Sequence, residues 1–471
     1  MGRRANVLIA GGSGFWSNNT HCAAMVALRM KGVEARLVGV CDPIDPHSAR
    51  DRPNLRALVN EDSPQWIDPA TMDSGELEDR LDRLHYEEHI DVLITATNPV
   101  HHYFYTKWAV KNRINAICDK PLVAVPDASF DLHSAKQIWR AYLDVRKEIL
   151  KARRENEAFS IICPLRRRAM APFMQIASGL SEVHLKTGEG ISHANVIQSC
   201  GIHKFPAELT NGGAHGYLDG IGSLSHSSYH YLDAMAWYLS AAPGETEEIE
   251  VSMPYLSRIR DYLDSGDHAR LMRLVEGGMV PDWDVDLPER VLNAERDMTF
   301  HLKLLDGDGR QRGLMNYTCN YTTFTPRTQR FDGNIVEYAN ERNGGRMSHL
   351  YIDVHQGALQ NFQLVKNDVV FRGHSILLNR RIHPRLGQDS LNQRFDDAYE
   401  KNAITVKEMV AAFIQKSAGM DHERAHLGMA QPYEGQALTN RLYSKFYELM
   451  AAQASGKEDE VDRRIRLGDI V

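Results

Sequence analysis

The sequence predicts an α/β protein with two domains. The first is a doubly wound domain on a parallel sheet, and the second is an α/β domain with an open, mainly antiparallel sheet. Before residue 165, short apolar runs alternate with segments of helical periodicity, which is typical of βαβ units. Beyond residue 165, segments of strand character follow one another with few helices between them. A chain of 471 residues suffices for both domains, which we place at 1–164 and 165–471.

The composition is that of an ordinary soluble globular protein, with 43% hydrophobic and 25% charged residues. A net charge of −7 offers no basic surface for nucleic acid, and no window is apolar enough to span a bilayer. Met1-Gly2-Arg3-Arg4 runs into a strand without a signal-peptide core, so we expect a cytoplasmic protein that contacts neither nucleic acid nor membrane. The six cysteines lack CxxC spacing, which indicates reduced thiols.

The first domain is arranged around one βαβ unit between Asp91 and Leu122. An apolar run at 92–96 predicts a strand buried on both faces, 102–112 predicts a helix, and 116–118 predicts a second strand. This second strand brings Asp119-Lys120-Pro121 to its carboxyl end, where parallel strands border a ligand crevice. We therefore expect Lys120 to point into that crevice.

A glycine-rich turn, Gly11-Gly12-Ser13-Gly14-Phe15-Trp16, separates a strand at 6–10 from a helix at 23–30. In this order, backbone N–H groups and a helix N-terminus can cradle a pyrophosphate. The best match to G-x-G-x-x-G is Gly12, Gly14 and Ser17, with Ser in the third place, and Asn18-Asn19-Thr20 lengthens the loop. The alternative is that the glycines only form a tight turn.

The next predicted strand, 36–41, ends at Asp42. A carboxylate there can accept hydrogen bonds from the adenosine ribose hydroxyls and would repel a 2′-phosphate, so NAD is favoured over NADP. The alternative is that Asp42 only begins a turn. Further helices are predicted at 76–84 and 134–155 and a last strand at 159–163, while 43–81 offers no other recognisable chemistry.

Arg166-Arg167-Arg168 directly follows the last strand of the first domain. Arginines in such a place are most often surface charge. At the domain junction, however, one of them can contact a polar or anionic substrate, and Arg167 is our candidate.

Strands of the second domain are predicted at 183–187, 194–199, 247–253, 298–305, 313–322, 349–354 and 362–370, and helices at 172–178, 404–417 and 435–454. Asp306-Gly307-Asp308-Gly309 predicts a hairpin turn. A helical insertion is expected near 255–290, as a lid or an oligomer contact. Because apolar strands would leave an apolar sheet face in water, we expect a homodimer or homotetramer through that face.

A second constellation lies between Gly220 and Leu239. His226, His230 and Asp233 are spaced i, i+4 and i+7, which places two imidazoles and a carboxylate on one face of a helix. The alternative is that the histidines satisfy buried groups. A zinc site is disfavoured because the HxxxH spacing lacks a paired Glu or Cys, so we predict no metal.

Together these pieces resemble the Gfo/Idh/MocA family of dinucleotide-dependent oxidoreductases over most of the chain. Thr97-Asn98-Pro99-Val100-His101-His102 resembles the family's TP-nhtH pattern, and Asp119-Lys120-Pro121 resembles its EKP motif. Gly222, Leu224, His230 and Asp233 match GGxLxDxxxHxxD. The resemblance implies an N-terminal Rossmann domain that binds the dinucleotide.

The resemblance also implies that Lys120 and His230 are catalytic, with His226 beside them. The expected cofactor contacts are Gly12, Ser13, Gly14, Phe15, Trp16, Asp42, Thr97, Asn98, His102, Asp119 and Lys120. The expected substrate contacts are Arg167, Lys204, His226 and His230. The chain departs from the family where Asp119 replaces Glu, Asn98 replaces Pro and His226 replaces a catalytic Asp. The last exchange alters proton transfer most, so either the reaction is unusual or the substrate supplies the missing charge.

The leading functional hypothesis is an NAD-dependent dehydrogenase acting on a secondary alcohol of a sugar, sugar derivative or cyclitol. His230 would take the hydroxyl proton, and Lys120 would hold the oxygen or act as the base itself. One alternative is a redox-neutral enzyme that oxidises a sugar transiently and then reduces it again. Another is a non-catalytic NAD-binding regulator, against which the presence of both Lys120 and His230 argues.

Overall fold

The computed structural model divides into two compact units, each built on one β-sheet. The first unit comprises Met1–Ala124, Arg140–Ala169 and Glu400–Gln436, and the second comprises Val125–Trp139, Met170–Tyr399 and Ala437–Val471. The structure describes residues 4–49, 51–199, 216–266, 286–322, 349–366, 375–387, 390–396, 399–420 and 428–470, together with Leu209 and Arg270. Each unit combines segments distant in sequence, unlike the contiguous ranges 1–164 and 165–471 expected above.

The sheet of the first unit has seven strands in the order β15-β6-β5-β4-β1-β2-β3. Its strands are β1 (Ala5–Ala10), β2 (Ala35–Cys41), β3 (Gln65–Ile67), β4 (Val92–Thr95), β5 (Asn115–Cys118), β6 (Ile161–Cys163) and β15 (Gln431–Pro432). All neighbouring pairs are parallel except β15 with β6. This pairing confirms the predicted doubly wound parallel sheet. Its apolar strands are buried on both faces, as is typical of parallel sheets.

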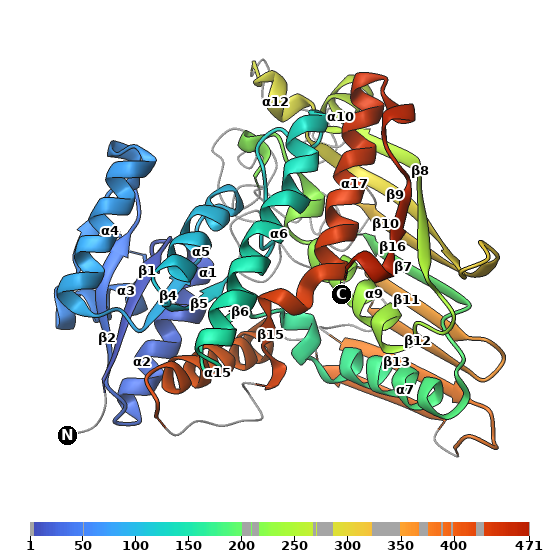
Figure 1. Ribbon diagram of the computed structural model, residues 1–471, viewed down its shortest axis with the longest axis horizontal. Coiled ribbons are helices and arrows are strands. Elements are labelled where there is room, and N and C mark those ends of the chain that lie inside the picture. The colour runs from blue at the N-terminus through green and yellow to red at the C-terminus, as the bar shows by residue number, and fades with distance from the viewer. Residues whose placement is uncertain are drawn as a thin grey trace. The chain divides into compact units, whose positions relative to one another are not determined.

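Helices cover this sheet on both faces (Figure 1). They are α2 (Ala23–Met30), α3 (Pro53–Asp62), α4 (Ser74–Glu88), α5 (His102–Lys111), residues 140–155 of α6 (Leu132–Glu155) and α15 (Tyr399–Ser417). Two elements in the Pro- and Asp-rich stretch after residue 43 were not predicted, namely α3, which begins at Pro53, and β3. None of the described helices is long and apolar enough to cross a bilayer.

One C-terminal helix completes the core of the first unit. Val406, Met409 and Phe413 of α15 are fully buried in the same apolar cluster as β1, β2 and α2. The helix was predicted from its periodicity, but its docking on the first unit was not. Amphipathic spacing shows that a helix has a buried face without showing which partner buries that face.

The second unit is built on a nine-stranded sheet in the order β14-β13-β12-β11-β7-β10-β9-β8-β16. Its strands are β7 (His193–Ser199), β8 (Glu248–Arg258), β9 (Glu295–Leu305), β10 (Gln311–Asn320), β11 (His349–Gln356), β12 (Gln360–Lys366), β13 (Ser375–Ile382), β14 (Leu391–Asp396) and β16 (Arg464–Arg466). Among the described strands of this sheet, only the β10–β7 pair is parallel. The predicted mainly antiparallel sheet is confirmed, while β13, β14 and β16 were not predicted.

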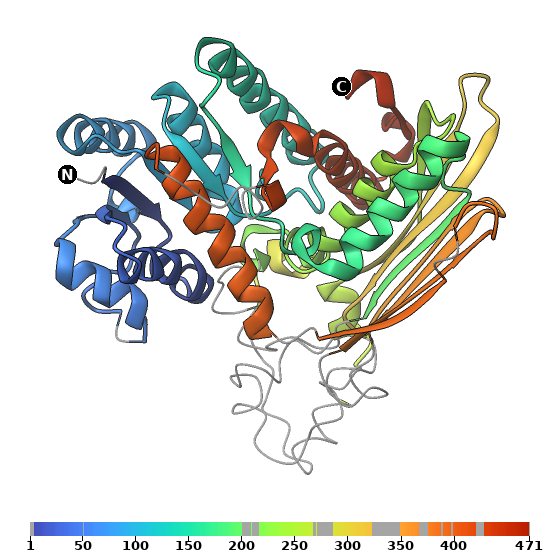
Figure 2. The ribbon, with the colours of Figure 1, turned by 90° about the horizontal axis from the view of Figure 1, so that it is seen from below.

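Three helices cover one face of this sheet, namely α7 (Ala171–Thr187), α9 (Tyr229–Ala241) and α17 (Ala437–Ser455) (Figure 2). The predicted strand at 183–187 is wrong, because these residues are the last turns of α7. Val183 continues the buried stripe of Ile176 and Leu180, and the helix ends at Gly188 with a φ of 75°.

The other face of the sheet is polar at its centre. Asn195, Asn316 and Asp353 lie side by side on β7, β10 and β11. Asn316 Nδ2 donates to Asn195 Oδ1 over 2.8 Å, and Asn361 Nδ2 donates to Asp353 Oδ1 over 2.7 Å. The expectation of an apolar patch is therefore wrong for these strands, because their apolar residues alternate toward the helices.

Part of the expected insertion near 255–290 is described. Residues 255–258 continue β8, and two short helices, α10 (Ile259–Asp264) and α12 (Glu289–Leu292), follow. Most of the segment between these helices lies outside the described residues.

Candidate functional site

The glycine turn follows β1, and its tightest position is Gly11, which the sequence motif did not single out. Gly11 has a φ of +83°, and a Cβ there would lie 2.4 Å from the Ala96 carbonyl oxygen. A glycine is needed because the ends of β1 and β4 approach closely. Gly14 precedes the helical segment, and a Cβ there would meet nothing nearer than 3.5 Å, so its backbone is open to a ligand.

Asp42 lies at the carboxyl end of β2 and is only 4% exposed. Its Oδ2 accepts the Ser13 backbone N–H over 2.9 Å, and its Oδ1 accepts the Ile44 N–H, also over 2.9 Å. Asp42 thus fixes the glycine turn and also begins the turn after β2. A carboxylate has about four acceptor positions, so two remain for another donor such as a hydroxyl.

His102 was expected to contact the cofactor, but the structure buries it between two strand-end loops. It is 1% exposed, with Nδ1 2.7 Å from the Pro121 carbonyl oxygen and Nε2 3.2 Å from that of Thr97. Because a carbonyl oxygen only accepts, Nδ1 donates at the shorter contact. Burial lowers the pKa of His102, and the contacts with the two carbonyls oppose part of that effect. His102 therefore connects the loop that follows β4 to the loop that follows β5.

Asp119 and Lys120 follow β5, as predicted, and both are half-buried. The Asp119 N–H donates to the Thr95 carbonyl over 3.0 Å. The Asp119 carboxylate lies 3.1 Å from Nε2 of His21, which is fully buried. No sequence motif identified His21, because its partner is 98 positions away.

His226 does not share a helical face with His230 and Asp233, so that prediction is wrong. Helix α9 begins at Tyr229, and His226 follows a short 3-10 turn with φ −115° and ψ −84°. Asp233 is fully buried and accepts a hydrogen bond from the Thr439 hydroxyl of α17 over 2.9 Å. His230 lies half-buried in the first turn of α9.

Aromatic rings surround His226, which is 2% exposed. Its ring packs edge-on against Tyr217 and Tyr321, with ring centres 6.0 and 5.4 Å away, and its Nδ1 lies 3.0 Å from the Ser227 hydroxyl. This environment is more enclosed than that of His230.

The loop that leads to His226 is held by Glu295, a residue that sequence reasoning missed. The fully buried Glu295 carboxylate accepts the backbone N–H groups of Gly222 and Leu224 over 2.7 and 3.0 Å. It also accepts the hydroxyl of Tyr447 over 2.9 Å and that of Ser129. Burial raises the pKa of Glu295, and these donors offset part of that effect.

Two expected substrate residues remain. Arg167 lies in a short 3-10 helix of the first unit and is 5% exposed, so it is not a surface arginine. Lys204 lies outside the described residues.

The structure thus groups the candidate residues by unit. The glycine turn, Asp42, Thr97-Asn98 and Asp119-Lys120 follow β1, β2, β4 and β5, so they lie at one edge of the first sheet. His226 and His230 flank the start of α9 in the second unit.

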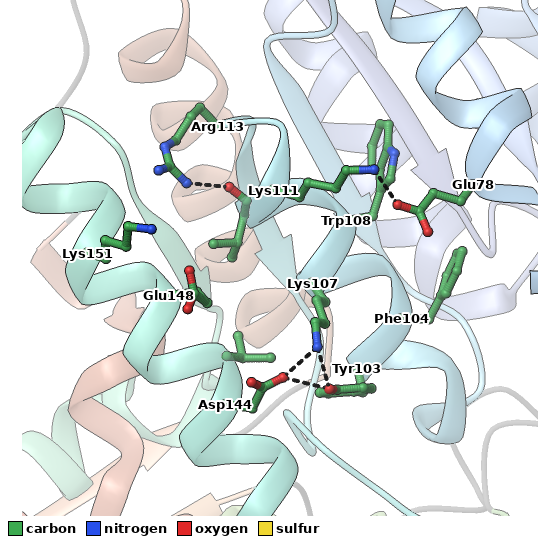
Figure 3. A pocket seen from close by; sticks show the side chains of 12 residues that line it. Glu78, Tyr103, Phe104, Lys107, Trp108, Lys111, Arg113, Asp144, Glu148 and Lys151 are labelled. Atoms are coloured by element: carbon green, nitrogen blue, oxygen red, sulfur yellow. Dashed lines mark hydrogen bonds and ion pairs between the residues drawn. The ribbon is translucent and has the colours of Figure 1, made fainter. Parts of the chain in front are cut away.

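A separate cavity of about 490 Å³ lies among α4, α5 and α6 of the first unit (Figure 3). It includes none of these candidate residues. Lys107 pairs with Asp144 over 2.7 Å, Lys111 pairs with Glu78, and Arg113 pairs with Glu155. Acidic neighbours therefore balance these three cations, and the lining does not indicate an anion site.

Residues 5–142 match a family model described as the oxidoreductase family with an NAD-binding Rossmann fold. No curated protein matches the sequence. An oxidoreductase from Agrobacterium radiobacter, solved with NAD+, L-tartaric acid and magnesium, aligns over 100% of both chains with 13% identity and a TM-score of 0.51.

Two further solved structures share the fold. Aldose-aldose oxidoreductase from Caulobacter crescentus aligns over 99% of this chain and 100% of its own, with 11% identity and a TM-score of 0.51. The transcriptional regulator Gal80p from Kluyveromyces lactis aligns over 99% and 92%, with 11% identity and a TM-score of 0.54. At these identities the likeness shows a common fold.

The buried Glu295 carboxylate yields a prediction. Glu295→Gln should lower the free energy of unfolding by about 1–3 kcal/mol, because the amide NH₂ would face a donor that the carboxylate now accepts. Thermal and chemical unfolding of the variant measure this loss, and Glu458→Gln at an exposed position near the end of the chain is the control.

The pH dependence gives an independent check. Because the folded pKa of Glu295 is raised, its contribution to stability is full at low pH and declines as pH rises above the ordinary value of 4.5 toward the raised one. Glu295→Gln should lack that decline. An unchanged pH profile in the variant would contradict the prediction.

Proposed function

We propose that the chain transfers hydride between NAD and a secondary alcohol or ketone of a sugar, sugar derivative or cyclitol, and the match of residues 5–142 to the Gfo/Idh/MocA oxidoreductase model supports this proposal. The observation that carries the proposal is Lys120 at the carboxyl edge of the Rossmann sheet, after β5, with only β4 between that strand and β1, which leads into the glycine turn. In such sheets ligands bind at this edge.

The residues at this edge fit a dinucleotide. Gly11 permits the tight turn, Gly14 leaves the backbone open, and the helical segment that begins at Phe15 directs its N–H groups toward the turn. Asp42 holds the turn through Ser13 and keeps acceptor capacity for a ribose hydroxyl. When bound, NAD supplies a carbon that accepts or returns the hydride.

His230 and Lys120 have distinct roles in the proposed reaction. The alcohol must lose its hydroxyl proton as hydride leaves, and a positioned imidazole can accept a proton near neutral pH. The Lys120 ammonium would stabilise negative charge that develops on the oxygen. The burial of His226 against Tyr217 and Tyr321 favours a role in shaping the site over direct proton transfer.

The substrate contacts remain part of this proposal. Arg167 would contact a polar or anionic group of the substrate, and Lys204 would contact a hydroxyl or carboxylate. A screen of sugars and cyclitols with NAD, followed by absorbance of the reduced nicotinamide, tests the reaction type. Net NADH would support a dehydrogenase, whereas product formation without net NADH would support the redox-neutral alternative. A non-catalytic regulator would show neither.

The first prediction of this proposal concerns Lys120 and His230. Lys120→Ala and His230→Ala should each lower kcat by roughly 10²–10⁴-fold, the usual effect of removing a positioned acid or base. NAD affinity should change little. Steady-state kinetics and calorimetry measure the two quantities on the same preparations.

Two exposed residues serve as matched controls, Lys151→Ala and His133→Ala, which should keep full turnover. The double variant of Lys120 and His230 should lose much less than the product of the single losses, because the two groups serve one proton transfer. Full turnover by Lys120→Ala would overturn the proposed mechanism.

The second prediction concerns cofactor choice. Asp42→Asn keeps an acceptor for the Ser13 N–H but removes the negative charge, so it should narrow the preference for NAD over NADP. Asp42→Ala should also weaken the binding of NAD, because the glycine turn loses the hydrogen bond from the Ser13 N–H to Asp42. Calorimetric titration with both dinucleotides checks this, and equal affinities in the native protein would refute it.

The third prediction concerns assembly. We propose a homodimer or homotetramer through the open sheet face of the second unit, joined by the polar residues around Asn195 and by Ile197, which is 38% exposed. Ile197→Asp should shift the assembly toward monomers in light scattering. A monomeric native protein at micromolar concentration would rule the proposal out.

A further inference from the structure

A π-helical turn interrupts the helix that follows the glycine turn. The segment runs from α1 (Phe15–Ser17) through a π-turn (Asn18–Cys22) into α2. The expectation that Asn18-Asn19-Thr20 lengthens a loop is wrong, because these residues belong to the π-turn. Single π-turns within α-helices frequently lie at functional sites, because the extra residue redirects side chains.

Buried polar side chains fill this π-turn. Asn18, Thr20 and His21 are between 0% and 2% exposed. Asn18 Oδ1 accepts the backbone N–H groups of Asn54 and Leu55 over 3.0 and 3.1 Å, so it caps α3. Capping accounts for Asn18, but it leaves the burial of His21 unexplained.

His21 contacts Asp119, which precedes Lys120. The His21 Nε2 and Asp119 Oδ2 atoms are 3.1 Å apart, and the two side chains are 0% and 16% exposed. A carboxylate only accepts, so Nε2 carries the proton and donates it. The other ring nitrogen, Nδ1, is buried and contacts no hydrogen-bond partner among the described residues. Within the described part of the chain, the contact with Asp119 is therefore the hydrogen bond that this ring makes.

The backbone around Lys120 is fixed on both sides. Before it, the Asp119 N–H donates to the Thr95 carbonyl, and His21 holds the Asp119 side chain. After it, the Pro121 carbonyl accepts from His102 over 2.7 Å. Two buried imidazoles thus brace the residues that flank Lys120 and leave the lysine side chain between them half-buried.

We propose that His21 is a positioning residue for the reaction, which acts through Asp119 to set the place of Lys120 in the crevice. This proposal rests on the proposed function, because Lys120 is the group whose position matters there. The π-turn places the buried His21 ring within hydrogen-bond distance of the Asp119 carboxylate at the end of β5. A misplacement of about 1 Å at a reacting group can cost on the order of 10²-fold in rate.

The test compares three variants of His21 and its partner in the full-length protein. His21→Met fills the ring's space without a donor, His21→Gln restores a donor, and Asp119→Ala removes the acceptor. His21→Met should lower kcat by about 10- to 100-fold with NAD affinity nearly unchanged. His21→Gln should recover much of that loss, and in an Asp119→Ala background, which has no acceptor for position 21, His21→Met should have little further effect.

Hydrogen exchange measured by mass spectrometry gives a readout that needs no substrate. Peptides that cover 115–124 should exchange faster in His21→Met than in the native protein, and His21→Gln should restore protection. Thr20→Val is the matched control, because it alters a fully buried residue of the same π-turn without touching Asp119. It should leave exchange at 115–124 and turnover unchanged.

Three outcomes would overturn the proposal. Unchanged hydrogen exchange at 115–124 in His21→Met would show that His21 does not fix the Asp119 segment. A loss confined to NAD affinity would show that His21 serves cofactor binding. Equal losses in His21→Met and His21→Gln would indicate a packing role. Full turnover by Lys120→Ala would instead contradict the proposed function. The hydrogen-exchange data would still show whether His21 fixes the Asp119 segment.

Discussion

Carboxylates enclosed by the protein and matched by hydrogen-bond donors hold the candidate functional loops in both units. Asp42 accepts from the glycine turn, Asp119 accepts from His21, and Glu295 accepts from the loop that leads to His226. An ionised carboxylate removed from water is costly unless donors surround it, so each acid restricts its loop to conformations that present those donors. Rigid loops follow from this constraint, and a rigid loop can hold a catalytic group in place.

An acidic residue in a sequence motif can stabilise the fold, contact the ligand, or do both. Asp42 was expected to meet a ribose, and the structure adds that it already fixes Ser13. Asp233 was expected on a chemically active face, and it instead joins α9 to α17 through Thr439. A polar residue in a motif can therefore serve the scaffold, the ligand or both. Its burial and its partners distinguish these roles, whereas its spacing does not.

Each unit is assembled from distant parts of the chain, and this bears on folding. The core of the first unit includes Phe413 of α15. At the edge of its sheet, β15 pairs with β6, which ends at Cys163, far earlier in the chain. The carbonyls of Tyr433 and Glu434 also accept from the Tyr142 hydroxyl. The N-terminal sequence therefore lacks part of its own core until the C-terminal segment has docked. Contacts of such long sequence separation are slow to form because loop closure costs entropy.

The sequence by itself determined the two sheet types, most strands and helices, and the strand-end positions of Asp42, Thr97 and Lys120. These follow from apolar periodicity and from local motifs, which act over a few residues. Only the tertiary structure decided that Gly11 makes the tight turn, that His226 lies off the helix, and that α15 belongs to the first unit. It alone paired His21 with Asp119 and Glu295 with Gly222. The physical reason is that burial and hydrogen bonding between residues far apart in the chain are decided by packing, which leaves no periodic signal in the sequence.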